Sequence, residues 1–429
     1  MIVLLPHVGF LSETSRMIAI YEALRARGVD ACVATHGGTW ESTLGASGVA
    51  YDLLEPRMSA ARCAEFLRQI PGVAARPGPS FTADELRAFA RSEAAYLRAR
   101  GARAVVTGFT LSALLSSRLA GVPLVTEHAG SFVPPMAERG LFPAPTRGPF
   151  PLAGLLPKRA QRWLANQGPV RARGFTEVID GVARELGVEG VPTLAAMLMG
   201  DLTLVTDVPE VTGVSREALE SWRPKTPRHY RADPVLRYVG PLFARLAVPI
   251  PDEVERFLRA PGPVVYVAMT SSLGSLVEDV VRRVEASGAR VLVAATAHRL
   301  DHLRSSRVCV AGVLPSHEVF PRVAAGVVTG GQGSVQTALA AGRPFVGIPL
   351  QPEQEWNVAA VERLGAAVRV SEASARGPAM TAAVRALLDD ASARAAAARI
   401  AAVFADIDGP GRCAEAILEY LDRRERRAS

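Results

Sequence analysis

The stretch that decides the fold runs from Val327 to Asn357 and reads VVTGGQGSVQTALAAGRPFVGIPLQPEQEWN. An apolar run ends at the glycine-rich turn of residues 330–334, a helix-compatible segment continues to Gly342, and a second apolar run occupies residues 344–349. This order of strand, glycine turn, helix and strand is typical of a parallel α/β sheet. Because the turn frees backbone N–H groups at a helix N-terminus, it predicts an anion-binding site.

Polar side chains follow the second apolar run. Glu353, Gln354 and Asn357 come after a strand end marked by Pro349, and ligands of open α/β sheets bind at that end of the strands. An anion site followed by carboxylate and amide groups suits a phosphate joined to a polyhydroxyl compound, such as a nucleotide sugar. The alternative is a turn that is glycine-rich for steric reasons alone.

The whole stretch resembles the donor-binding signature of the family 1 glycosyltransferases of the macrolide and plant types. Their pattern runs His-Gly-Gly, any residue, Gly-Ser/Thr, a helix, Gly-x-Pro, a strand, Pro, Asp/Glu-Gln and Asn. The spacing fits without a gap, but Thr329 stands where the family has its histidine. The resemblance implies a GT-B fold, in which two Rossmann-like doubly wound parallel-sheet domains face a cleft.

By this resemblance, the backbone and hydroxyl groups of the turn hold the diphosphate, together with Ser271 or Ser272, and Glu353 and Gln354 contact the sugar. The segment around Leu314 is similar to the one that holds the donor base. The ribose-binding glutamate of the family falls at Thr337, which favours dTDP over UDP as the nucleotide. The predicted donor-binding residues are Ser271, Ser272, Leu314, Thr329, Gly330, Gly331, Gln332, Gly333, Ser334, Glu353 and Gln354.

The catalytic base is less clearly marked. The family's histidine position falls on Glu13, and the acid that orients that histidine is missing near Thr107 and Gly108. Related glycopeptide and sterol glycosyltransferases have a carboxylate in the histidine position, which makes Glu13 the candidate base. An acid in the first turn of a helix also stabilises that helix. His7 and His128 are the competing candidates, because each follows or ends a predicted strand.

Strand and helix patterns restart after residue 245, which predicts three segments. Residues 1–245 form an acceptor-binding domain, and residues 246–411 form the nucleotide-sugar-binding domain. Residues 412–429 form a helix that crosses back to the first domain. Residues 130–170, rich in proline, correspond to the acceptor region of the resembling enzymes.

Composition narrows the class of protein further. The chain has 429 residues, a net charge of +7 and four cysteines without metal-ligand spacing. No basic stripe with interleaved aromatic residues indicates a nucleic-acid partner, and no segment reaches membrane-spanning length. These features predict a cytoplasmic protein with no metal or other cofactor and no stable membrane insertion. A homodimer remains open.

The sequence therefore predicts an inverting, metal-independent glycosyltransferase that moves a sugar from a dTDP- or UDP-sugar to a hydroxyl group of an apolar small molecule. The resemblance to antibiotic glycosyltransferases implies a role in secondary metabolism. Two alternatives stay open: a nucleotide-sugar epimerase or hydrolase of the same fold, and a non-catalytic homologue that binds a ligand or partner.

Overall fold

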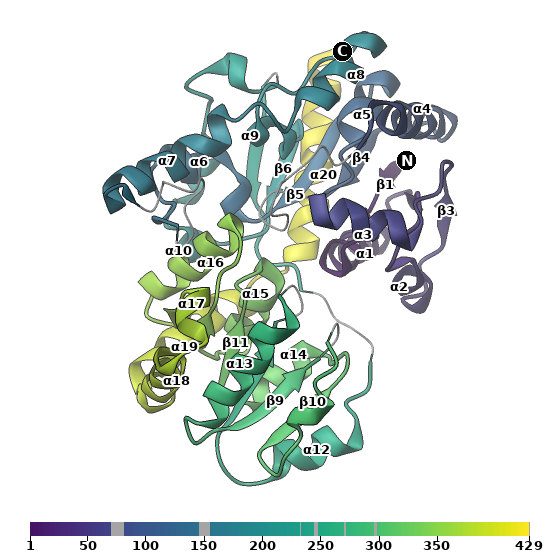
Figure 1. Ribbon diagram of the computed structural model, residues 1–429. Coiled ribbons are helices and arrows are strands. Elements are labelled where there is room, and N and C mark those ends of the chain that lie inside the picture. Colours follow the sequence, from purple (N-terminus) through teal and green to yellow (C-terminus); the bar gives the residue numbers. More distant parts are fainter. Residues whose placement is uncertain are drawn as a thin grey trace. The chain divides into compact units, whose positions relative to one another are not determined.

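The computed structural model describes residues 1–69, 81–145, 155–231, 233–243, 248–269, 272–295 and 298–428. The chain divides into two compact units (Figure 1). Unit 1 comprises Met1–Ala144, Leu155–Leu242 and Asp408–Ser429, and the main segment of unit 2 is Phe243–Ile407. These limits lie a few residues before the domain boundaries expected from the sequence. In the described ranges, no helix is long and apolar enough to cross a bilayer.

Unit 1 is built on a seven-stranded sheet of order β3-β2-β1-β4-β5-β6-β7, in which all neighbours pair in parallel. The strands are β1 (Ile2–Leu4), β2 (Ala31–Thr35), β3 (Tyr51–Leu53), β4 (Ala104–Thr107), β5 (Leu124–His128), β6 (Leu202–Val205) and β7 (Val235–Tyr238). The helices are α1 (Leu11–Ala26), α2 (Glu41–Ala46), α3 (Ala60–Gln69), α4 (Ala83–Ala99), α5 (Ala113–Ala120), α6 (Pro134–Glu138), α7 (Lys158–Arg171), α8 (Glu177–Leu186), α9 (Leu194–Met197), α10 (Pro209–Thr212), α11 (Arg216–Glu220) and α20 (Gly409–Ala428).

The apolar strands of unit 1 are buried on both faces. Val3 and Val105 belong to one hydrophobic cluster, whereas Ile2, Leu4 and Val106 belong to the cluster on the opposite face. This alternation follows from the two-residue period of a strand, and burial on both faces explains why the sequence shows continuous apolar runs.

Unit 2 is built on a six-stranded parallel sheet of order β10-β9-β8-β11-β12-β13. The strands are β8 (Val264–Ala268), β9 (Arg290–Ala294), β10 (Val308–Ala311), β11 (Ala325–Val328), β12 (Phe345–Gly347) and β13 (Ala367–Arg369). The helices are α12 (Asp252–Arg259), α13 (Gly274–Glu285), α14 (Ser316–Val319), α15 (Gln332–Ala340), α16 (Pro352–Arg363), α17 (Glu372–Ala375), α18 (Pro378–Asp389) and α19 (Ala391–Ala405). The prediction of two doubly wound parallel sheets is thus confirmed.

The strand order gives each unit a topological switch point. In unit 1 the chain leaves β1 toward one side of the sheet and continues from β4 on the other side, and in unit 2 the same happens between β8 and β11. The crevice beyond the carboxyl ends of such strands is where ligands of doubly wound sheets bind. The turn at 330–334 follows β11, and Glu13 lies just after β1.

The last helix of the chain, α20, completes unit 1. It lies against α1 and β6, and its residues Cys413, Ile417 and Leu421 are buried in the same cluster as the first strand (yellow ribbon in Figure 1). The helix begins at Gly409, shortly before residue 412, where the sequence predicts its start. The carboxylate of Asp408 caps it by accepting the N–H group of Gly411 at 3.0 Å.

Candidate functional site

Glu13 joins two loops at the switch point of unit 1. It lies in the first turn of α1 and has no solvent exposure. Its Oε1 atom accepts three backbone N–H groups, from His7 at 3.1 Å, Gly108 at 3.0 Å and Phe109 at 2.8 Å. The loops after β1 and β4 supply these donors. The other oxygen, Oε2, is buried and has no hydrogen-bond partner among the described residues.

This environment changes the acidity of the carboxyl group. Burial raises the pKa of Glu13 to about 7, and it outweighs the hydrogen bonds from Phe109 and His7, which act in the opposite direction. A group with a pKa near 7 is a stronger proton acceptor than an ordinary carboxylate and is still largely ionised just above neutral pH. With one oxygen fixed and the other unpartnered, Glu13 has the geometry of a general base.

His7 has a different hydrogen-bonding role. Its Nδ1 atom accepts the N–H group of Gly9 at 3.2 Å, and burial lowers the pKa of His7 to about 4, so the ring is neutral near pH 7. A neutral ring that accepts at Nδ1 carries its proton on Nε2. His7 is therefore a donor at Nε2, an atom without a partner in the described part of the chain. This tautomer suits binding of an oxygen atom better than removal of a proton.

His128 ends β5 and is 1% exposed. Burial, together with the positive charge of Arg16, lowers the pKa of His128 to about 3. Neither ring nitrogen has a partner among the described residues, so nothing there fixes the orientation of the ring. The ring stacks edge-on against Phe109 at 5.1 Å, which places it close to Glu13 without a direct bond. Of the three candidate bases, Glu13 is the one that this geometry favours.

A second carboxyl group lies beside Glu13. The sequence places the orienting acid of the family near Thr107 or Gly108, where none exists, but Glu127 of β5 reaches the same place. A Cβ atom on Gly108 would lie 2.9 Å from Glu127 Oε1 and 3.0 Å from Glu13 Cδ. Sequence reasoning gave Glu127 no role of its own. The sequence signal for it is a charged residue next to His128 at the end of a buried strand.

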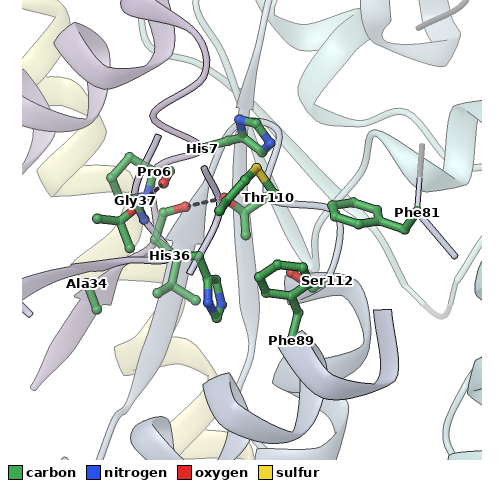
Figure 2. A pocket seen from close by; sticks show the side chains of 12 residues that line it. Pro6, His7, Ala34, His36, Gly37, Phe81, Phe89, Thr110 and Ser112 are labelled. Atoms are coloured by element: carbon green, nitrogen blue, oxygen red, sulfur yellow. Dashed lines mark hydrogen bonds between the residues drawn. The ribbon is translucent and has the colours of Figure 1, made fainter. Parts of the chain in front are cut away.

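A small cavity lies beside the His7 ring, at the carboxyl ends of β1 and β2 (Figure 2). Below it, His36 places Nδ1 3.0 Å from the carbonyl oxygen of Pro56 and Nε2 3.2 Å from Glu93 Oε1. The cavity is lined by Leu5, Pro6, His7, Ala34, Thr35, His36, Gly37, Met58, Phe81, Phe89, Thr110 and Ser112.

Aromatic rings gather around this edge of the sheet. Six of the fourteen phenylalanines and three of the seven histidines form one connected group of ring contacts. Phe10, Phe109 and Phe132 are only half-buried, and the first two are 5.4 Å apart by ring centroid. The members are Phe10, Phe66, Phe81, Phe89, Phe109, Phe132, His7, His36 and His128. Such a surface can bind an apolar molecule beside Glu13.

In unit 2 the glycine turn follows β11 as expected, but its glycines differ in what the fold requires. Gly330 has φ +94°, and a Cβ atom there would lie 2.5 Å from Val358 Cγ2. Gly331 has φ −60° and begins α15 as its N-cap, and a Cβ atom would meet nothing within 4 Å at either Gly331 or Gly333. The fold therefore needs glycine at 330, whereas the other two glycines leave open space in front of the helix N-terminus.

Glu353 closes part of that N-terminus. Its Oε1 atom accepts the N–H group of Gln332 at 3.1 Å and the side-chain amide of Asn357 at 2.6 Å. Asn357 also donates to the carbonyl oxygen of Gly330 at 2.9 Å, so it fixes Glu353 and the turn together. The N–H groups of Gly333 and Ser334 have no acceptor among the described residues. First-turn N–H groups of this kind are the usual ligands of a phosphate.

The remaining predicted donor residues are placed as follows. Gln354 is buried, and its Oε1 atom accepts the N–H group of Leu350 at 2.8 Å. The hydroxyl of Ser272 donates to the carbonyl oxygen of Met269 at 2.7 Å, in the loop after β8. Thr329 and Leu314 are buried, and Ser271 lies outside the described residues. Among the described residues, no group of three or more His, Cys, Asp or Glu side chains could hold a metal ion.

Comparison with solved structures identifies the fold. The glycosyltransferase VinC, solved in complex with dTDP, superimposes with a TM-score of 0.66 at 16% identity, over 99% of this chain and all of that one. The calicheamicin glycosyltransferase CalG4 gives 0.64 at 19% identity, over 98% of both chains. The predicted GT-B fold is therefore confirmed.

Sequence comparison identifies the family. A PGL/p-HBAD biosynthesis glycosyltransferase of Mycobacterium tuberculosis is 30% identical over 304 residues, which are 70% of this chain and 66% of that protein. A PGL/p-HBAD biosynthesis rhamnosyltransferase of Mycobacterium bovis is 29% identical over 70% of this chain and 63% of its own length. Residues 196–410, which contain the whole donor signature, match the family described as UDP-glucoronosyl and UDP-glucosyl transferase. The chain belongs to this family.

Proposed function

We propose that the chain is an inverting glycosyltransferase that moves a sugar from a nucleotide diphosphate sugar to a hydroxyl group of an apolar small molecule. The observation that carries the proposal is the Glu13 carboxyl group, fixed through Oε1 by three backbone N–H groups and unpartnered at Oε2. Family membership and the donor turn in unit 2 support it. Membership of a transferase family favours sugar transfer over an epimerase, a hydrolase or a non-catalytic homologue.

In the proposed reaction, the acceptor oxygen attacks the anomeric carbon while its proton passes to Glu13 Oε2. The bond from that carbon to the diphosphate breaks, and the nucleoside diphosphate leaves with the electron pair. The N–H groups of Gly333 and Ser334 and the dipole of α15 stabilise the charge that develops on the leaving group. We therefore propose that the reaction needs no metal ion, so that EDTA leaves the rate unchanged.

For the donor we propose a dTDP-sugar. Thr337, in place of the glutamate that would bind a 2′-hydroxyl group, donates its own hydroxyl to the carbonyl oxygen of Gly333 at 2.7 Å. It is thus engaged with its helix and offers no carboxylate to a ribose. VinC, which shares the fold, was solved with dTDP. Glu353, next to the helix N-terminus, is the proposed partner of the sugar hydroxyls.

For the acceptor we propose an apolar alcohol or phenol of a natural-product pathway, bound against Phe10, Phe109 and Phe132. The rings of His7 and His128 are neutral near pH 7 and add no charge to this surface, which favours an uncharged ligand. Donors of this kind are cytoplasmic metabolites, so we place the reaction in the cytoplasm.

The direct test incubates the purified chain with dTDP-glucose or UDP-glucose and a panel of apolar alcohols and phenols, with mass spectrometry of the products. We expect a glycosylated acceptor and free nucleoside diphosphate in equal amounts. The coupling constant of the anomeric proton should show an inverted configuration. Release of free sugar without any acceptor product would instead support a hydrolase, and tight nucleotide binding without turnover would support a non-catalytic homologue.

A further inference from the structure

The two buried carboxyl groups of unit 1 share one neighbour, Gly108. Glu13 approaches it from α1, and Glu127 approaches it from β5. Any side chain at position 108 would displace one of the two groups, because a Cβ atom there would lie about 3 Å from both. Both residues have no solvent exposure. Two carboxyl groups that both lie about 3 Å from one Cβ position influence each other's charge.

Arg16 holds the second carboxyl group. Its Nε atom donates to Glu127 Oε1 at 2.7 Å and to Oε2 at 2.8 Å, and the two side chains are 7% and 0% exposed. Arg16 lies three residues after Glu13, so α1 presents the carboxyl group and the guanidinium on one face. The helix thus carries both the candidate base and the cation that binds its neighbour.

Few other charges face this group. His7 from the loop after β1 and His128 from β5 are neutral near pH 7, because burial lowers the pKa of each. Cys413 of α20 faces Glu127, and burial raises the pKa of its thiol, so it is neutral as well. In the described part of unit 1, Glu127 and Arg16 are therefore the groups whose charge bears on Glu13, the first raising its pKa and the second lowering it. Burial raises the pKa of Glu127 itself, and the ion pair with Arg16 opposes that effect.

We propose that Glu127 is a positioning residue for Glu13: its carboxylate, held beside Gly108 by Arg16, sets the pH range in which Glu13 acts as the base. The proposal rests on the function proposed above. The acid that orients the base is then Glu127 on β5, one strand away from Thr107 and Gly108, where the sequence predicts such an acid. A removed Glu127 would leave the buried guanidinium of Arg16 to act alone on Glu13, which would then release its proton at lower pH.

The test is the pH dependence of kcat/KM in Glu127→Gln. We expect the acidic limb of the profile to move down by about one pH unit, and the maximal rate to fall because Glu13 becomes a weaker base. In Arg16→Gln/Glu127→Gln both charges are gone, so the limb should return to near the wild-type position. Glu127→Asp keeps the ion pair but draws the carboxylate away from Gly108. We expect Glu127→Asp to shift the acidic limb in the same direction as Glu127→Gln, but by less. This variant replaces Glu127→Gln in the test if Glu127→Gln does not fold.

The matched control is Asp201→Asn. Asp201 forms a two-bond ion pair with Arg118, at 2.7 Å for each bond, at the opposite end of the same sheet. Its loss should lower the melting temperature without moving the pH profile. A merely structural role for Glu127 predicts the same outcome for Glu127→Gln and would overturn the proposal.

A second readout does not depend on activity. Infrared titration of the carboxyl band that disappears in Glu13→Gln reports the protonation of Glu13 directly. We expect its midpoint to fall in Glu127→Gln by the same amount as the kinetic limb. An unchanged midpoint would refute the role of Glu127 whatever the reaction. A shifted midpoint in a chain that transfers no sugar would leave the electrostatic role standing and refute the proposed function instead.

Discussion

Glu13 combines two properties that pull in opposite directions. Three backbone N–H groups stabilise its ionised form, whereas complete burial favours its protonated form, and burial has the larger effect. A carboxyl group that served only to join two loops would be more stable if N–H groups bound both of its oxygen atoms. The unpartnered Oε2 atom is explained by a proton acceptor and not by a loop anchor.

The first prediction follows from that atom. Glu13→Gln keeps the shape and the hydrogen-bond acceptor but cannot take a proton, so kcat should fall by roughly 10²–10⁴ while dTDP affinity stays unchanged. His7→Gln and His128→Gln are the matched comparisons and should retain measurable turnover. If Glu13→Gln is as fast as the wild type and one histidine variant is inactive, that histidine is the base.

The second prediction concerns stability and pH. Because the pKa of Glu13 is raised from its ordinary value of 4.5 to about 7, the folded protein binds this proton more tightly than the unfolded chain does. The stability from this group is therefore complete below pH 4.5 and is lost as the pH rises through 7. Glu13→Gln removes this titration. The difference between its melting temperature and that of the wild type should therefore shift in favour of Glu13→Gln as the pH rises from 5 to 8. A constant difference across that range would contradict the raised pKa.

At the scale of the elements, two glycines of the turn after β11 have different roles: the fold requires Gly330, whereas Gly331 leaves space for a ligand. Gly330→Ala should destabilise the protein, because it places a side chain at φ +94° against Val358. Gly331→Val has open space and an ordinary φ, so unit 2 should stay folded. We expect calorimetry to show loss of dTDP binding in the folded Gly331→Val protein, since the side chain blocks approach to the helix N-terminus. Unchanged affinity would exclude this turn as the diphosphate site.

The elements also show why the sequence marks the donor turn more clearly than the surroundings of Glu13. The donor turn is local: its glycines, the helix after it and Glu353 lie within thirty residues, so spacing alone places them together. Glu127 meets Glu13 only because β5 lies next to β4 in the sheet, a pairing between distant segments that no local pattern contains. The tautomer of His7 likewise depends on the N–H group of Gly9, a backbone contact without a sequence signature.

At the scale of the molecule, α20 packs into the core of unit 1, the unit that also contains β1 and α1. Side chains of α20 fill the cluster that also holds Ile2, Met17 and Leu24. Arg103 and Glu425 add an ion pair at 2.7 Å over the far end of the helix. Unit 1 therefore lacks part of its core until α20 has been made, whereas the strands and core of unit 2 belong to one continuous segment.

The last prediction tests this division by unfolding the two units separately. Ile417→Ala leaves a cavity where a fully buried side chain of α20 meets the core of unit 1, and a change of this kind costs about 2–5 kcal/mol. Calorimetry should show one transition that falls in Ile417→Ala and a second that dTDP raises, because the nucleotide binds only to folded unit 2. Val384→Ala, in the core of unit 2, is the matched control and should lower the dTDP-sensitive transition. If Ile417→Ala lowers the dTDP-sensitive transition to the same extent, the two units unfold together, and the stability of the donor site depends on α20.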